Sequence, residues 1–233
     1  MNNLQQKLYD ILIAVSDEKY KSFITKTTNS PTPLLGVKVP LLKKIAAEVL
    51  KSDGLISVLK IESGVFVEYE FIKGFCIAKA VIDIDKKFYY LEEFTKTVDN
   101  WAVCDSTSSA LKIPKSNHEI LWKFIERLIK SDYPFCVRFG IVLMLQNFAD
   151  SQNFERVISQ LKNIAYGKHY YIDMAAAWLV SVLLINCYER TVAFLSDNNC
   201  PLDIFTRNKA LSKATESYRI DIQKKIYLKT LKI

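Results

Sequence analysis

Apolar residues recur at helical spacing along almost the whole chain, and this pattern limits the possible folds more than any other feature. At the start, Leu4, Leu8, Ile11, Leu12 and Val15 form one apolar stripe. No stretch shows the sustained period-two alternation that is typical of strands. The 233 residues include only six Gly and six Pro, well under half the usual combined share of about 12 %. Because sheet proteins use these residues at turns, their scarcity favours long helices joined by short loops.

Local signals place many of the expected helices. Pro40 suits the first position of one helix, and Ser116 with Glu119 matches a capping box that opens another. The apolar pattern predicts further helices over residues 65–81, 134–148, 153–165, 169–187, 188–197, 203–216 and 220–231. The main break in the pattern is the loop around residues 28–39, and no segment has the composition of a linker. We therefore expect one domain over residues 1–233.

Three of the expected helices are alike, since each is apolar with one isolated polar or Trp residue. Their markers are Trp101, Arg138 and Trp178, which lie 37 and 40 residues apart. This spacing is close to the period of roughly 40 residues in HEAT and armadillo repeats. The sequence thus predicts an all-α superhelix, a solenoid of HEAT-like helix pairs. The inner helix of each pair would line a concave surface, and the outer helix would cover the back.

The chain is basic, with a formal net charge of +7. From residue 207 onward there are eight basic residues and two acidic ones. The basic residues are Arg207, Lys209, Lys213, Arg219, Lys224, Lys225, Lys229 and Lys232. Such a stretch inside a helical pattern fits a polyanionic partner and predicts a basic groove. A solvated, Lys-rich terminal helix would give the same pattern.

The five cysteines show no CxxC or Cys–His spacing, and four of them lie in apolar helical patterns. They are typical of small buried hydrophobic residues in a reducing compartment, so neither a disulfide framework nor a metal site is expected. The first ten residues lack the features of a signal peptide. The longest apolar run, residues 174–185, is shorter than the about 20 residues that a bilayer requires. We expect a cytoplasmic protein without a membrane partner.

Four residues are candidates for a functional site. Trp101 and Asp105 are four residues apart, so they share one face of a helix, although a core Trp and an Asp near a helix start are also common structural features. Arg138 has almost only apolar neighbours and needs an anionic partner or a solvent-facing groove; a structural ion pair would meet this need equally well. Trp178 lies in an Ala-rich helix whose small residues could leave its ring exposed, although core packing is the more common fate. On three consecutive inner helices, the four residues would converge on one concave site.

Several segments of the chain add a further clue: residues 35–40, 99–106, 137–138, 174–178, 208–211 and 216–219. Together they resemble the AlkD-like DNA alkylation repair family of HEAT-like glycosylases. The resemblance extends from about residue 20 to residue 220, and its most specific part is the helix with the Trp-x-x-x-Asp motif of Trp101 and Asp105. It implies a monofunctional glycosylase that removes N3- and N7-alkylated purines from duplex DNA.

The resemblance also implies roles for the four candidates. A purine alkylated at these positions carries a positive charge and leaves without a strong general acid. Asp105 would stabilise the oxocarbenium-like sugar and position the hydrolytic water. Trp101 and Trp178 would press their faces against the sugar and backbone, and Arg138 would hold a phosphate near the lesion.

The DNA-binding set implied by the resemblance and by the basic stretch is larger. Active family members carry an Arg three residues after the second Trp, where this chain has Ser181, so that cation is lost. Besides Arg138, the expected DNA-binding residues are Ser181, Arg207, Lys209, Lys213 and Arg219. We expect a monomer that acts on duplex DNA containing alkylated bases and that needs no cofactor.

Two other functions fit the sequence. One is a catalytically weak HEAT-repeat protein that binds nucleic acid through its phosphates alone. The other is a protein-interaction scaffold with an acidic partner. The presence of both Trp residues and of Asp105 favours the glycosylase over the scaffold, because a scaffold needs no carboxylate inside a basic trough. Ser181 keeps the weak DNA-binding alternative open.

Overall fold

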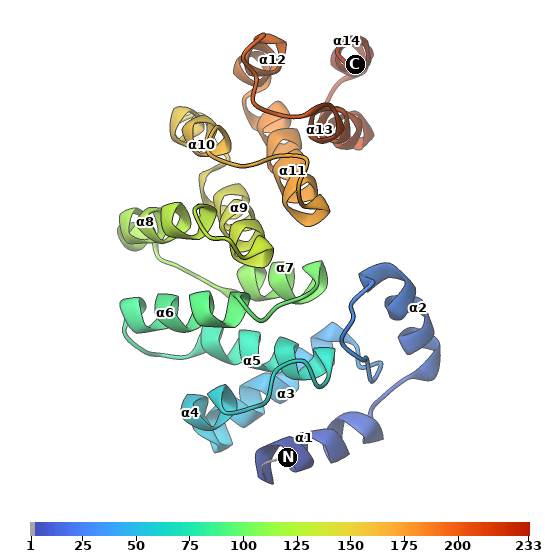
Figure 1. The fold of residues 1–233 in the computed structure, drawn as a ribbon, viewed down its shortest axis with the longest axis vertical. Helices are drawn as coiled ribbons and strands as arrows, with labels where there is room; N and C mark the ends of the chain where they lie inside the picture. The colour runs from blue at the N-terminus through green and yellow to red at the C-terminus, as the bar shows by residue number, and fades with distance from the viewer. Residues whose placement is uncertain (1–2) are drawn as a thin grey trace. The chain divides into compact units, whose positions relative to one another are not determined.

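The computed structural model describes residues 3–233, and every regular element within that range is a helix (Figure 1). This confirms the prediction of an all-α fold. The described residues form two compact units, residues 3–114 and residues 115–233, which we call unit 1 and unit 2. The predictions of a single domain over residues 1–233 and of one basic groove along it concern both units together, and they stay predictions.

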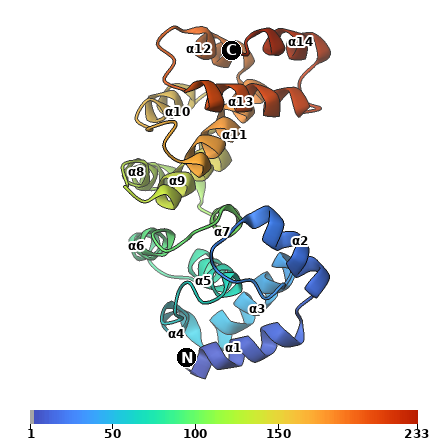
Figure 2. The same ribbon diagram turned by 45° about the vertical axis from the view of Figure 1, so that its right-hand side comes forward.

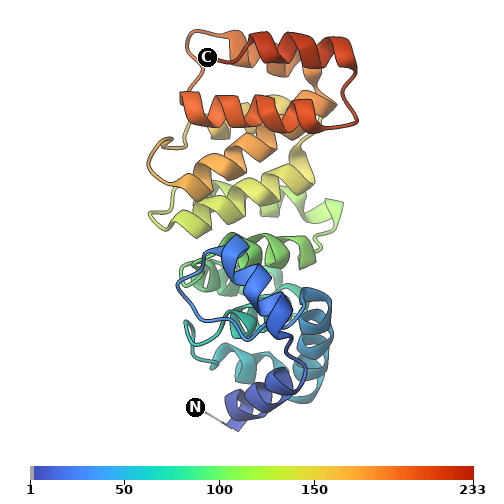
Figure 3. The same cartoon turned by 90° about the vertical axis from the view of Figure 1, so that its right-hand side faces the viewer.

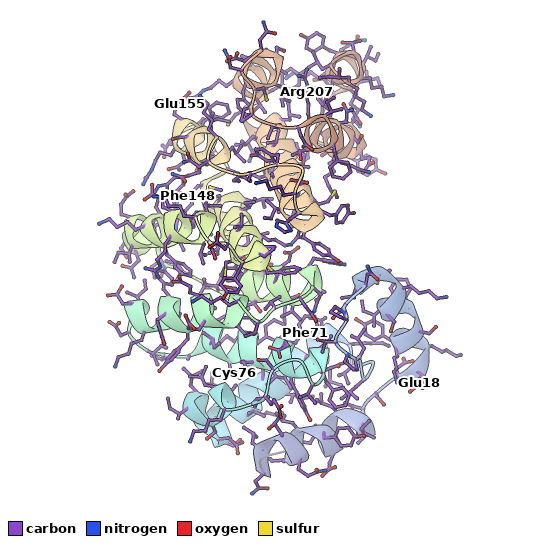
Figure 4. The ribbon with its side chains drawn as sticks, viewed as in Figure 1. Glu18, Phe71, Cys76, Phe148, Glu155 and Arg207 are labelled. Carbon is purple, nitrogen blue, oxygen red and sulfur yellow. The ribbon has the colours of Figure 1, made fainter. Side chains whose placement is uncertain are left out.

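Unit 1 is built around one buried helix, α5. Its helices are α1 (Asn3–Ala14), α2 (Glu18–Thr28), α3 (Val39–Ser52), α4 (Gly54–Leu59), α5 (Val67–Lys79), α6 (Ile84–Thr95) and α7 (Trp101–Ala110). Helix α5 packs between α3 and α7, and α4 and α6 also contact it. Every residue from Val67 to Ala78 is buried; Figure 4 shows Phe71 and Cys76 in this interior.

Unit 2 is also built around buried inner helices, and in this unit inner and outer helices alternate along the chain. Its elements are a 3₁₀-helix (Lys115–Asn117), α8 (His118–Ile129), α9 (Pro134–Phe148), α10 (Phe154–Leu161), α11 (Tyr170–Asn186), α12 (Tyr188–Ser196), α13 (Ile204–Glu216) and α14 (Ile222–Thr230). Helices α9, α11 and α13 pack side by side in that order (Figure 2). Helix α8 packs against α9, α10 also contacts α9, and α12 packs against α11. Within this unit, the alternation of inner and outer helices is the one that helix-pair repeats produce.

The predicted capping box at Ser116 is wrong. The chain first forms the 3₁₀ turn Lys115–Asn117, so Ser116 lies inside that turn and the N-cap of α8 is Asn117. Asn117 makes no side-chain capping bond. Glu119 instead accepts a hydrogen bond of 2.7 Å from Arg156, which lies on α10.

The burial of four cysteines agrees with the expectation from their apolar helical patterns. All five are free thiols, and Cys76, Cys104, Cys136 and Cys187 are buried. Burial raises the pKa of the Cys76 thiol to about 12. Among residues 3–233, no helix is long and apolar enough to cross a membrane.

Candidate active site

The start of α7 positions the most specific pair of candidate residues, Trp101 and Asp105. Asn100 is the N-cap, and its side-chain oxygen accepts a hydrogen bond of 3.0 Å from the main-chain N–H of Val103. Trp101 is therefore the first residue of the helix, and Asp105 lies one turn later on the same face. The helix dipole acts mainly within the first turn, where Asn100 already supplies the cap. Capping thus does not account for Asp105, which is partly exposed.

Trp101 is not a core residue. Its side chain is 36 % exposed, whereas Trp122 is 4 % exposed and packs edge-on against the Phe148 ring. The indole N–H of Trp101 donates a hydrogen bond of 3.3 Å to the main-chain carbonyl of Thr27. Thr27 lies near the end of α2, which is in front of α7 in Figure 3. The last turn of α2 therefore holds one edge of an indole that remains accessible to a ligand.

Helix α2 is in turn held by a buried carboxylate, Glu68. The Glu68 oxygens accept hydrogen bonds of 3.0, 2.9 and 3.2 Å from the successive main-chain N–H groups of residues 35–37. The Gly36 carbonyl accepts a bond of 3.1 Å from the N–H of Asp17, the N-cap of α2. Gly36 has φ +97°, and a Cβ there would lie 2.7 Å from the Cβ of Lys21. Glycine therefore allows the loop to approach α2 closely.

A second carboxylate, Asp99, anchors the other end of the same loop. It accepts hydrogen bonds from the hydroxyls of Ser30, at 2.9 Å, and Thr32, at 2.5 Å. Asp99 directly precedes the N-cap of α7. These two bonds therefore join the loop that follows α2 to the start of α7. Asp99 and Glu68 thus fix the surroundings of Trp101 from two sides. Our sequence analysis missed both roles, although the two Glu residues within the apolar pattern of residues 65–81, Glu68 and Glu70, were an available signal for buried carboxylates.

In unit 2, Arg138 lies almost entirely inside the protein. Its side chain is 6 % exposed, and Nη1 donates a hydrogen bond of 2.7 Å to the main-chain carbonyl of Tyr171. Tyr171 belongs to the first turn of α11, so the guanidinium of Arg138 joins α9 to that turn. This geometry supports a structural role. The phosphate contact expected for Arg138 stays a prediction.

Trp178 and Ser181 differ sharply in exposure although both lie on α11. Trp178 is 36 % exposed, the same fraction as Trp101, so its ring is also available at the surface. Ser181 is 4 % exposed, and its hydroxyl donates a bond of 2.7 Å to the Trp178 carbonyl one turn earlier. The Ser181 hydroxyl is therefore used within the helix. A contact between Ser181 and DNA stays a prediction.

Four of the residues expected to bind DNA are basic residues that follow α12, and two of these four donate hydrogen bonds to other parts of unit 2. Arg207, labelled in Figure 4, donates a bond of 3.2 Å to the Leu231 carbonyl and so fastens the C-terminal residues to α13. Arg219 is exposed and donates a bond of 3.1 Å to the side-chain oxygen of Asn186. Arg219 thus combines a fixed position with an accessible charge.

The two lysines lie one turn apart on α13, where residues four apart share a face. Lys209 is exposed, and its Nζ lies 5.5 Å from the centre of the Phe205 ring. Lys213 is partly exposed. Among the predicted DNA-binding cations, Lys209 and Arg219 are therefore the most accessible.

The structure brings the candidates together in two groups. Unit 1 pairs Trp101 with Asp105, and unit 2 holds Arg138, Trp178 and Ser181 on the packed helices α9 and α11. The convergence of both groups on one concave surface stays a prediction. In the described part of the chain, no cluster of His, Cys, Asp or Glu side chains is arranged to hold a metal ion.

These features define an all-helical repeat protein with a carboxylate and an accessible indole on one helix face. The family described as DNA alkylation repair enzyme matches residues 8–214. The chain belongs to this family, and the resemblance inferred from the sequence is confirmed. No curated protein sequence matches the chain. The matched range includes all of α7 and ends within α13, so α14 lies beyond it.

Proposed function

We propose that this protein is a DNA glycosylase that excises positively charged N3- and N7-alkylated purines from duplex DNA. The observation that carries the proposal is the pairing on α7 of the accessible indole of Trp101 with the partly exposed carboxylate of Asp105. Membership of the DNA alkylation repair enzyme family supports DNA as the partner. The formal net charge of +7 is suited to the phosphate backbone.

The reaction requires stabilisation of positive charge more than it requires an acid. An alkylated purine that carries a formal positive charge departs as a neutral base when it takes both electrons of the glycosidic bond. The sugar is then left with oxocarbenium character. The Asp105 carboxylate would lower the energy of this developing cation and would hold the attacking water. Water adds to the sugar carbon and gives its proton to the carboxylate or to solvent, which leaves an abasic site.

Each of the two exposed tryptophans would suit contact with a cationic reactant. The negative face of an indole attracts a nearby cation. Trp101 is held by Thr27, so its ring would need little reorganisation when DNA binds. Trp178 offers a second exposed indole on unit 2. Lys209 and Arg219 would add contacts with backbone phosphates.

A second function is favoured by one specific observation, the buried Ser181. Active members of the family that the sequence resembles carry an Arg at this position, and such a cation would strengthen binding to the DNA backbone. Without it, the chain could be a relative that binds duplex DNA through other phosphate contacts but hydrolyses no glycosidic bond.

The test is release of free base from duplex DNA that contains 7-methylguanine, measured with enzyme in excess. The glycosylase proposal expects release well above spontaneous depurination. Tight binding of the same duplex with release at the spontaneous rate would establish the second function instead. If the protein neither binds the duplex nor releases base, both functions are wrong.

A further inference from the structure

A row of aromatic rings crosses unit 2 where its three inner helices begin. The ring centres of Phe135 and Tyr171 are 5.1 Å apart, those of Tyr171 and Tyr170 are 5.5 Å apart, and those of Tyr170 and Phe205 are 6.0 Å apart. These residues come from the first turns of α9, α11 and α13, which all begin on the left side of unit 2 in Figure 3. We call these four residues the aromatic row. Ring contacts at such distances are favourable.

The aromatic row is buried at one end and open at the other. Phe135 is 8 % exposed, whereas Phe205 is 37 % and Tyr170 is 60 % exposed. The bond from Arg138 to the Tyr171 carbonyl holds the first turn of α11 from within. The exposed rings are thus supported by packed rings and by the hydrogen bond from Arg138. A rigid aromatic surface of this kind loses little conformational entropy when a ligand binds.

Two lysines lie next to the exposed end of the aromatic row. Lys209 lies above the Phe205 ring, and the exposed Lys168 lies two residues before Tyr170. The nearby acids are engaged in the fold. Asp173 is buried and accepts a bond from the Gly167 N–H at 3.2 Å, and Asp203 caps α13 by accepting a bond of 3.0 Å from the N–H of Thr206.

We propose that the aromatic row is a stacking site for an unpaired base of a DNA strand that continues from the bound duplex. This inference rests on the proposed function, because it assumes that the protein binds duplex DNA. Exposed rings next to cations suit a partner that has flat aromatic faces joined by phosphates. In an intact duplex the base faces are covered by their neighbours, so an unpaired base is the form that can stack on Tyr170 and Phe205.

The experiment compares a blunt duplex with the same duplex carrying a short single-stranded extension that contains 2-aminopurine. Stacking of one base on an aromatic side chain corresponds to roughly a 5- to 150-fold gain in affinity. We expect the wild type to bind the extended duplex more tightly within that range and to quench the aminopurine fluorescence. The double variant Tyr170→Leu with Phe205→Leu keeps apolar side chains but has no rings. It should bind the blunt duplex as the wild type does and should lose both the preference and the quenching.

Two controls separate stacking from a general change in the protein. Tyr170→Phe keeps the ring and should retain the preference. Tyr89→Leu removes a ring of unit 1 that is 59 % exposed and should also change nothing. Thermal unfolding followed by circular dichroism verifies that each variant is folded before binding is measured.

The outcomes distinguish the stacking site from the proposed function. If the wild type releases 7-methylguanine and binds the blunt duplex but gains nothing from the extension, the stacking site is wrong and the glycosylase stands. Equal quenching by the wild type and the double Leu variant also overturns the stacking site. If the wild type binds no duplex, the proposed function fails. In that case, the stacking site would still be supported if the wild type, but not the double Leu variant, quenched the fluorescence of the free aminopurine strand.

Discussion

The guanidinium of Arg138 donates a hydrogen bond of 2.7 Å to the main-chain carbonyl of Tyr171, so one buried cation joins α9 to the first turn of α11. Arg138→Met keeps much of the side-chain volume but removes the donor. The Tyr171 carbonyl would then lose the charged donor that joins it to α9, and a hydrogen bond to a charged group typically contributes about 1.5 to 3 kcal/mol. We expect the free energy of unfolding to fall by that amount in urea titrations.

The salt dependence of DNA binding separates this structural role from a phosphate contact. Each phosphate contact contributes about 0.9 to the log–log slope of affinity against salt concentration. Arg138→Met should leave the slope unchanged, whereas Lys209→Met, which removes an exposed cation, should reduce it by about that amount. A reduced slope for Arg138→Met at unchanged stability would instead assign Arg138 to the DNA.

Glu68 offers a test of how the surroundings of Trp101 are held. Glu68→Gln keeps the shape but removes the charge and replaces one acceptor oxygen with an amide group. The three N–H groups of residues 35–37 would then have weaker or missing acceptors. We expect the free energy of unfolding to fall by about 2 to 3 kcal/mol. The matched control Glu93→Gln alters an exposed ion pair with Lys96 and should change stability by less than about 0.5 kcal/mol. Equal effects would show that Glu68 does not anchor the loop.

Local sequence patterns were sufficient to predict that the fold is helical and that two residues of the candidate site share one helix face. Apolar spacing predicted the all-α fold, and the four-residue separation of Trp101 and Asp105 placed them on one helix face. The contacts that fix this face join distant residues, such as Asp99 with Thr32 and Trp101 with Thr27. No local periodicity encodes such pairs, because they depend on how helices pack. The contact between the Tyr170 and Phe205 rings also depends on helix packing, so the sequence did not predict it.

The buried Glu70 predicts a pH dependence of stability. Its oxygen accepts a bond of 3.0 Å from the Gly64 N–H, and burial raises its pKa above the ordinary value of 4.5. The attraction of Lys73 opposes this shift, and the repulsion of Asp99 adds to it. In the window between the two pKa values the folded state holds more protons at Glu70 than the unfolded state does. The free energy of unfolding therefore falls as pH rises through that window.

Glu70→Gln removes this titration. The free energy of unfolding of Glu70→Gln minus that of the wild type should increase as pH rises above 4.5, by at most about 1.4 kcal/mol per pH unit. It should become constant once the wild-type carboxyl is ionised in the folded state. Chemical denaturation of both proteins across this range measures the difference. A constant difference at all pH values would mean that Glu70 titrates alike in the folded and unfolded states.

Asp105 carries the chemistry of the proposed glycosylase, so its amide variant gives the sharpest test. Asp105→Asn keeps the shape and removes the charge, and losing one preorganised electrostatic contact typically lowers a rate about 10²- to 10³-fold. Affinity for duplex DNA should stay the same or increase, because an anion has been removed from a surface that the proposal places near phosphates. Trp101→Ala should cost less in rate, since it removes an indole face rather than a charge. The exposed Asp132→Asn serves as the matched control and should release base as the wild type does. The measurement is single-turnover release of 7-methylguanine at saturating enzyme, and equal rates for the wild type and Asp105→Asn would exclude a catalytic role for this carboxylate.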